Sequence, residues 1–246
     1  MNFSRALAAA AIAVVLGVAS ARAQTAVDLE LVLAVDASRS IDEWEYALQR
    51  DGYVAALTDP RVLKAITSGP VGRIAICYVE WSNSDEQAKL VDWTVIAGAA
   101  DAATFAELLR NQPRRFYGRT SISGAVDFSA HEIARNAYAG TRRTIDVSGD
   151  GINNQGRPVI AARDDAVEAG ITINGLAIIN DRPQRFPNPP ISLDAYYRDN
   201  VIGGPGGFMM VVNGFRTFGE AITKKLVLEI AGVPDAAPGD SLAERR

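Results

Sequence analysis

Oxygen-bearing side chains follow an apolar run near the start of the chain. Asp36, Ser38 and Ser40 alternate directly after residues 32–35, which are Val-Leu-Ala-Val. Such a run is typical of a buried strand, so the polar residues lie on the turn that leaves its end. Carboxylate and hydroxyl oxygens are hard ligands that suit Mg²⁺, Mn²⁺ or Ca²⁺ better than zinc. The spacing therefore predicts a divalent-cation site on this turn.

The same residues also have a purely structural interpretation. Ser40 and Glu43 have the spacing of a capping box, with Ser at the N-cap and Glu three residues later. Asp36 and Ser38 can simply shape a strand-to-helix turn. Short motifs match by chance, so these residues alone leave both interpretations open.

The periodicity along the chain predicts alternating strands and helices. We expect strands at residues 28–36, 71–81, 88–96, 144–148, 171–179 and 208–212, and helices at 41–57, 101–110, 121–138, 158–169, 192–201 and 215–230. In the first helix, Trp44 and Leu48 are expected to face the core. This alternation favours an α/β, Rossmann-like three-layer sandwich. Its six-stranded sheet is mostly parallel with one antiparallel edge hairpin (residues 71–96), and helices cover both faces.

Two later segments favour the metal interpretation. Asp150 follows the expected fourth strand, and Thr120 precedes an amphipathic helix. Ligands of mainly parallel sheets bind at the carboxyl ends of the strands, where the strand order reverses. We therefore expect Asp36, Thr120 and Asp150 to meet at one edge of the sheet. Taken alone, Thr120 can be an N-cap and Asp150 part of a turn.

The order Asp36-x-Ser38-x-Ser40, then Thr120, then Asp150-Gly151 closely resembles the metal-ion-dependent adhesion site of von Willebrand factor type A domains. The resemblance covers about residues 27–232. It implies that these five polar residues hold Mg²⁺ (or Mn²⁺ or Ca²⁺), partly through water. It also implies an open coordination position that an Asp or Glu of an unidentified partner protein fills, so the site docks a partner and is not an enzyme centre.

Finer details resemble a bacterial family of exported, uncharacterised A-type domains, which is DUF1194-like. They are the segment Val-Ser-Gly-Asp-Gly-Ile-Asn-Asn at residues 147–154, the strand end Glu80-Trp81 and the glycine-rich segment before Phe208. One departure from the wider family is Gly149, which separates Ser148 from the expected ligand Asp150.

The first 23 residues have the pattern of a secretory signal peptide: Arg5, an apolar run at residues 6–19, and Ala21-Arg22-Ala23 as the cleavage site. We expect a periplasmic or secreted domain at residues 24–232 without a membrane span, a loop-rich excursion at 180–207 and a disordered tail at 233–246. Loss of Arg5 and Arg22 with the signal changes the formal net charge from −4 to −6, which argues against nucleic-acid binding. The oligomeric state is left open.

Other notable side chains have structural interpretations. Cys77, the single cysteine, is expected to be a buried inert thiol. Asp146 lies within a strand, where a hydrogen-bonded structural role is expected. His131 lies in a helix and lacks the partners of a zinc site or a catalytic triad. Glu80 is a weaker candidate for the neighbourhood of the site.

Two rival functions share parts of this pattern. Asp36 as nucleophile and Asp150 as a magnesium ligand resemble haloacid-dehalogenase-type phosphatases. That family's general acid is replaced by Ser38, a later acid by Asn154, and its lysine is not evident. The other rival is a structural or assembly subunit that binds through residues 180–207, with Phe186, Tyr196 and Tyr197 as aromatic anchors.

Overall fold

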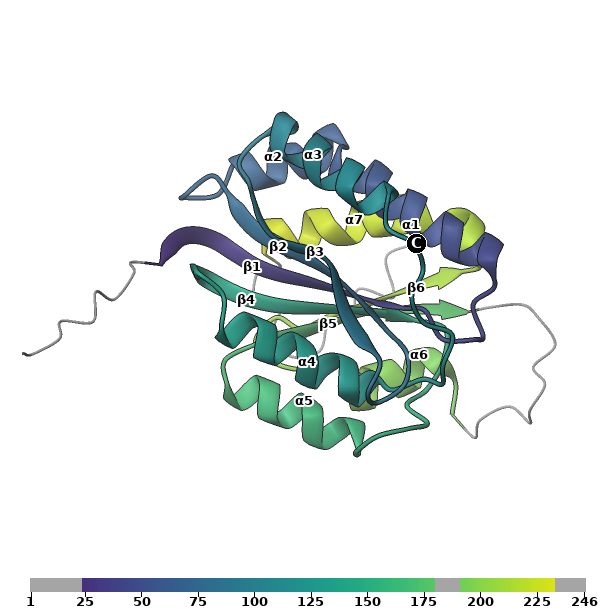
Figure 1. Cartoon of the computed structure of the whole chain (residues 1–246). Helices are drawn as coiled ribbons and strands as arrows, with labels where there is room; N and C mark the ends of the chain where they lie inside the picture. Colours follow the sequence, from purple (N-terminus) through teal and green to yellow (C-terminus); the bar gives the residue numbers. More distant parts are fainter. Residues whose placement is uncertain (1–23, 180–190, 233–246) are drawn as a thin grey trace, which may run out of the picture.

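The apolar runs form the strands of one six-stranded sheet (Figure 1). The computed structural model describes residues 24–179 and 191–232, so the expected signal peptide and tail lie outside the described residues. The strands are β1 (Thr25–Asp36), β2 (Ile74–Trp81), β3 (Gln87–Ile96), β4 (Tyr138–Gly149), β5 (Thr172–Ile179) and β6 (Met209–Asn213). Their order is β3-β2-β1-β4-β5-β6, and β3 alone runs antiparallel to its neighbour. The predicted fold class and edge hairpin are confirmed.

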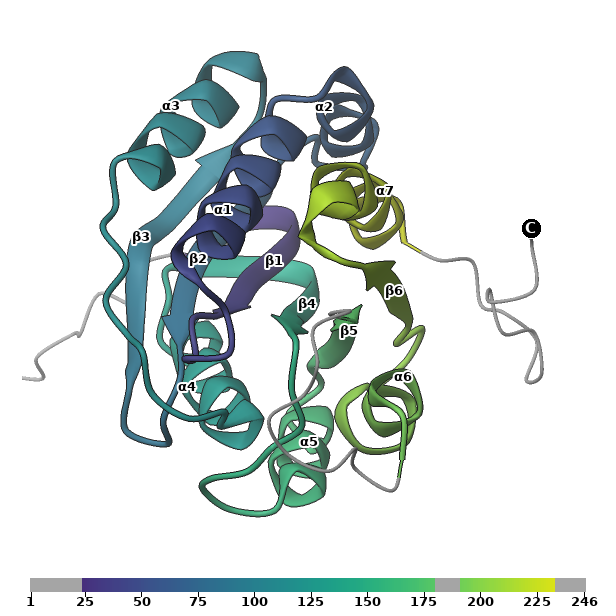
Figure 2. The same cartoon turned by 90° about the vertical axis from the view of Figure 1, so that its right-hand side faces the viewer.

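Helices cover both faces of this sheet, as predicted. The helices are α1 (Glu43–Leu57), α2 (Pro60–Thr67), α3 (Ala99–Arg110), α4 (Ile122–Ala134), α5 (Val159–Glu168), α6 (Leu193–Tyr196) and α7 (Phe218–Ala231). A π-helical turn (Tyr197–Val201) continues α6, and a 3-10 turn (Phe215–Thr217) precedes α7. Figures 1 and 2 show α1, α2, α3 and α7 on one face and α4, α5 and α6 on the other. A separate apolar core fills each interface.

Some elements differ from the sequence predictions. The fourth helix ends at Ala134, and β4 already begins at Tyr138, because the first residues of β4 pair with the start of β1. Helix α2 is absent from the predicted elements. The proline at position 60 is expected to follow the end of a helix, whereas it occupies the first turn of a new one capped by Asp59.

The orientation predicted for the first helix is wrong in part. Trp44 is 50% exposed, and the guanidinium of Arg216 lies over its ring, 5.5 Å from the centroid. The buried stripe of α1 runs instead through Tyr46, Gln49 and Tyr53, a pattern less apolar than the one expected. Leu48 does pack against the core, as predicted.

A buried ion cluster joins α7 to the sheet. Lys225 of α7 is fully buried, and its Nζ lies 2.5 Å from Asp146 Oδ1 of β4 and also pairs with Glu229. Asn174 of β5 donates to Glu229 at 3.0 Å. Burial, followed by the charge of Asp146, raises the pKa of Glu229 to about 7. Asp146 therefore has a structural role through an ion pair, and the hydrogen bonds expected for it are not formed among the described residues.

Cys77 is fully buried within β2, and burial raises the pKa of its thiol well above the usual value, which fits the inert thiol expected. Across residues 24–179 and 191–232, no helix combines the length and apolar character that crossing a bilayer requires.

Candidate metal-binding site

The predicted ligands lie where the strand order reverses. Strands β2 and β3 are added to one side of β1, and β4, β5 and β6 are added to its other side. The strand order therefore reverses between β1 and β4. Val35 of β1 pairs with Ser148 of β4, which brings the ends of the two strands together. Figure 2 looks onto this edge of the sheet. Asp36 and Asp150 thus meet in the place where α/β sheets bind ligands.

Hydrogen bonds link four of the five predicted ligands. Asp36 Oδ1 accepts from the backbone N–H of Ser38 at 2.7 Å, and the hydroxyls of Ser38 and Ser40 lie 3.0 Å apart. Ser40 Oγ donates to Asp150 Oδ1 at 2.6 Å. The loop at residues 36–40, here called the DxSxS loop, is therefore joined to the end of β4 by its own side chains.

The capping alternative for Ser40 is wrong. Helix α1 is capped by Asp42, which accepts from the backbone of Glu45, while the Glu45 side chain accepts from the backbone of Asp42. The capping box is thus shifted by two residues from the predicted one. Ser40 lies before the cap, and its hydroxyl bonds to Asp150 instead.

Thr120 lies beside the Asp150 loop. The N-cap of α4 is Ser121, whose hydroxyl accepts from Gly124, so the Thr120 side chain is not used as a cap. Asn154 joins the two loops: its N–H donates to the Thr120 carbonyl at 2.9 Å, and its side-chain oxygen accepts from the Thr120 N–H at 3.1 Å. A Cβ placed on Gly151 would lie 3.4 Å from Thr120 Oγ1. The Thr120 hydroxyl therefore faces the turn that carries Asp150.

The electrostatics of this cluster favour a cation. Asp36 is completely buried, and its Oδ2 has no hydrogen-bond partner. Burial, followed by the nearby charge of Asp150, raises the pKa of Asp36 to about 8. A buried carboxylate oxygen without a partner is costly unless the group is protonated or binds a cation. The orphaned oxygen, a second carboxylate and adjacent hydroxyls fit a hard divalent cation.

The donor set contains oxygen alone. Within the described ranges there is no group of three or more His, Cys, Asp or Glu side chains that could hold a metal, so hydroxyls would have to complete the two carboxylates here. His131 is exposed on α4 and contacts Arg135, away from these loops.

Gly149, the residue that departs from the pattern of the wider family, lies in a tightly packed position. It is the last residue of β4, and a Cβ there would lie 2.9 Å from Asp36 Oδ2 and 2.9 Å from the Tyr197 hydroxyl. Only glycine lets the strand end approach both groups this closely. Tyr197 is fully buried with an unpartnered hydroxyl, so its side chain is not accessible as the aromatic anchor of the rival assembly function. Tyr196 is partly buried, and Phe186 lies outside the described residues.

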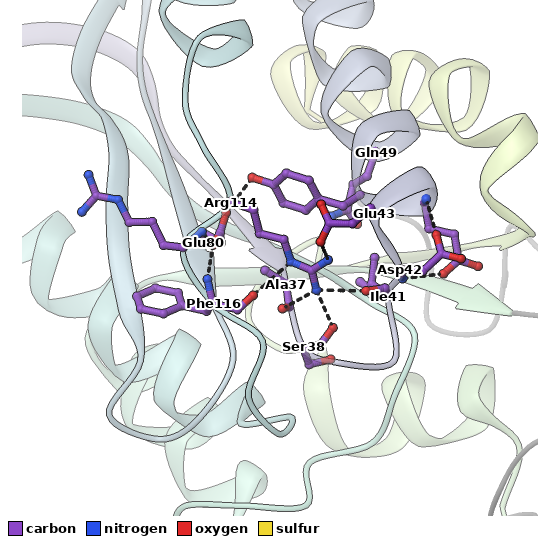
Figure 3. Close-up of polar contacts among 12 residues, drawn as sticks. Ala37, Ser38, Ile41, Asp42, Glu43, Gln49, Glu80, Arg114 and Phe116 are labelled. Atoms are coloured by element: carbon purple, nitrogen blue, oxygen red, sulfur yellow. Dashed lines mark hydrogen bonds and ion pairs between the residues drawn. The ribbon is translucent and has the colours of Figure 1, made fainter.

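The sequence interpretation missed the side chain that supports the DxSxS loop from behind. Arg114, in the irregular connection between α3 and α4, has a side chain only 3% exposed. One guanidinium nitrogen donates to the carbonyls of Ala37 (3.0 Å), Ser38 (3.0 Å) and Ile41 (2.9 Å), as Figure 3 shows. The basic character of residues 113–118 was visible in the sequence, but nothing there distinguished this arginine from its neighbours.

Solved structures with the same fold come from several organisms. Proximal thread matrix protein 1 (PTMP1) from the mussel byssus matches with a TM-score of 0.60 and 17% identity over 85% of this chain. The pilus adhesin SpaC from Lactobacillus rhamnosus GG matches with a TM-score of 0.58 and 13% identity, also over 85% of this chain. A von Willebrand factor type A protein from Catenulispora acidiphila matches with a TM-score of 0.54 and 14% identity over 83%. This chain spans 49%, 31% and 43% of their respective lengths.

These similarities and the observed topology define the class: the fold is that of a von Willebrand factor type A domain. The chain belongs to the family described as "Protein of unknown function (DUF1194)", whose sequence model matches residues 26–234. No curated protein sequence matches the chain. The fold implied by the resemblance and the membership of the DUF1194 family are thus confirmed.

Proposed function

We propose that this protein is an exported, metal-dependent binding module. Asp36, Ser38, Ser40, Thr120 and Asp150 hold a divalent cation, with Mg²⁺ as the expected ion and Mn²⁺ or Ca²⁺ as alternatives. A carboxylate of a partner protein completes the coordination. The domain thereby docks a partner and catalyses no reaction.

The observation that carries this proposal is the orphaned carboxylate oxygen of Asp36. It is fully buried, next to Asp150, in the loops that the sequence pattern singles out. A divalent cation would neutralise both carboxylates and supply the missing partner. One structure of PTMP1, which matches this chain with a TM-score of 0.59, has a zinc-occupied MIDAS (metal-ion-dependent adhesion site) motif. That likeness supports a metal in the equivalent loops.

Calorimetric titration of chelator-treated protein with Mg²⁺, Mn²⁺ and Ca²⁺ tests the proposal. We expect saturable binding at one site in the wild type, and loss of binding in Asp36→Ala and Asp150→Ala. Asp164→Ala, which changes a 61% exposed carboxylate on α5, is the matched control and should bind as the wild type. Equal binding by all four proteins would overturn the assignment of these ligands.

The two rival functions make different predictions. A phosphatase would hydrolyse a generic phosphate ester and lose turnover in Asp36→Asn, whereas a docking module shows no turnover. A subunit that binds through residues 180–207 would keep its partner in chelator and in Asp36→Ala. For the export step, mass spectrometry of the protein from the periplasm should find a mature chain that begins near Gln24.

A further inference from the structure

An extended segment beside the proposed cation site presents arginines to solvent. In residues 115–119, Arg115, Tyr117 and Arg119 are exposed and the residues between them are partly buried. Arg39, in the DxSxS loop, is also exposed, and its N–H donates to the Gly118 carbonyl at 3.0 Å. We call Arg39, Arg115, Tyr117 and Arg119 the arginine strip. It leads directly into Thr120, so it borders the proposed site.

Side chains of β2 and of the turn that follows it hold the inner side of this segment. Glu80 of β2 is fully buried and accepts from the backbone N–H groups of Arg115 (2.7 Å) and Phe116 (2.9 Å), and from the Tyr46 hydroxyl (2.7 Å). Figure 3 shows Glu80 and Phe116 in this arrangement. Further along, Asn83 accepts from the N–H of Arg119 at 2.7 Å. The strip is thus fixed although it belongs to no strand of the sheet.

Arg114 fixes the strip to the DxSxS loop. Besides its bonds to that loop, its Nε donates to the Phe116 carbonyl at 3.0 Å. Its guanidinium lies 4.2 Å from the ring centroid of Tyr117, so it covers the inner face of a ring that is 56% exposed. A surface whose backbone is already ordered binds a ligand with little further loss of conformational entropy.

No ion pair joins Arg39, Arg115 or Arg119 to another residue in the described part of the chain. Two acids lie close to the strip: Glu43, which pairs with Arg114 at 3.1 Å, and Glu86, which accepts from Ser82. The whole chain nevertheless has a formal net charge of −4. Three exposed arginines therefore border the proposed site on a chain that is acidic overall.

We propose that the arginine strip is a docking surface for an acidic peptide segment of the partner. This inference rests on the proposed function: one carboxylate of the segment lies at the cation, and the next carboxylates pair with the arginines. Arg115 and Arg119 are four residues apart in an extended segment, a span of about 13 Å, which an extended peptide of four or five residues covers. Guanidinium groups bind carboxylates with paired hydrogen bonds, so the strip selects clustered acids over an isolated one.

Fluorescence anisotropy with a labelled pentaglutamate peptide in millimolar Mg²⁺ tests this proposal. The double variant Arg115→Gln/Arg119→Gln should weaken peptide binding about fivefold or more, and Arg115→Glu/Arg119→Glu should weaken it further. The matched control is Arg73→Gln/Arg135→Gln, which removes the same charge at the opposite end of the sheet and should bind as the wild type. Calorimetry with Mg²⁺ alone should give the same metal affinity for all these proteins.

The outcomes separate the two proposals. Intact Mg²⁺ binding with unchanged peptide affinity in both strip variants would overturn the docking surface alone. Tighter binding of a single-stranded oligonucleotide of equal charge than of the peptide would also overturn it, in favour of a phosphate ligand. Absence of any Mg²⁺ binding by the wild type would overturn the proposed function and this inference with it.

Discussion

Replacement of Lys225 by Met tests how the last helix is held to the sheet. The substitution keeps a long, unbranched side chain but removes the cation from between Asp146 and Glu229, both of which are buried. Removal of one partner from a buried ion cluster costs about 3–5 kcal/mol, because the remaining charge has no compensation. For a domain of this size, that corresponds to a fall in Tm of roughly 10 °C.

The pH dependence of this loss identifies its cause. Without Lys225, the native state must bind a proton to neutralise one of the two carboxylates, whereas the unfolded state releases it above about pH 4. Stability of Lys225→Met should therefore fall as pH rises from 5 to 8, more steeply than that of the wild type. The double variant Lys225→Met/Glu229→Gln should recover part of the stability at pH 8.

Urea denaturation at pH 5 and pH 8 measures both effects. Lys224→Met is the matched control, because Lys224 is 61% exposed and lies 3.9 Å from Glu220 on the outer side of α7. It should change the free energy of unfolding by less than about 0.5 kcal/mol. Equal losses in the two single variants, or the same loss at both pH values, would refute the buried-charge reasoning.

Three further predictions concern the proposed cation site. In chelator, Asp36→Asn should be more stable than the wild type at pH 8 but not at pH 4. The raised pKa of Asp36 (about 8) makes the wild type lose up to about 5 kcal/mol of stability over this range, and urea midpoints that differ equally between the two proteins at both pH values would contradict this. Arg114→Ala should weaken Mg²⁺ binding by about 10- to 100-fold in calorimetry, because the hydrogen bonds to the carbonyls of the DxSxS loop are lost, and Arg114→Lys should weaken it less. Unchanged affinity in both variants would show that Arg114 does not support the site. Gly149→Ala should displace Asp36 or Tyr197, so the free energy of unfolding measured in urea should fall by about 1–3 kcal/mol and Mg²⁺ binding should weaken. Wild-type stability and affinity would show that the end of β4 is not closely packed.

The parts of the fold set by local pattern were predictable from the sequence. Apolar runs that end in Asp36 and before Asp150 identified two parallel strands, and the polar residues after them identified the edge where they meet. The helix predicted at residues 158–169 ends before Gly170, whose φ of +74° favours glycine at the end of α5. Hard oxygen donors in separate loops were recognisable because residue type and spacing are both local properties.

Features that depend on contacts between distant residues were not predictable in this way. The early start of β4 depends on pairing with the first residues of β1, more than a hundred positions away. Trp44 is exposed because the core contacts of α1 fall on Tyr46 and Tyr53. Arg114 is a support of the DxSxS loop only because the connection between α3 and α4 folds back over that loop. No local pattern encodes these three outcomes.

The central claim is that a cation binds between the DxSxS loop, Thr120 and Asp150. Crystals grown with Mn²⁺, measured for anomalous scattering from manganese, test it most directly. The account predicts one strong anomalous peak bonded to oxygens of these loops, with Asp36 Oδ2 facing it directly or through water. A map without a peak at this edge of the sheet, or with its strongest peak elsewhere on the domain, would contradict the account.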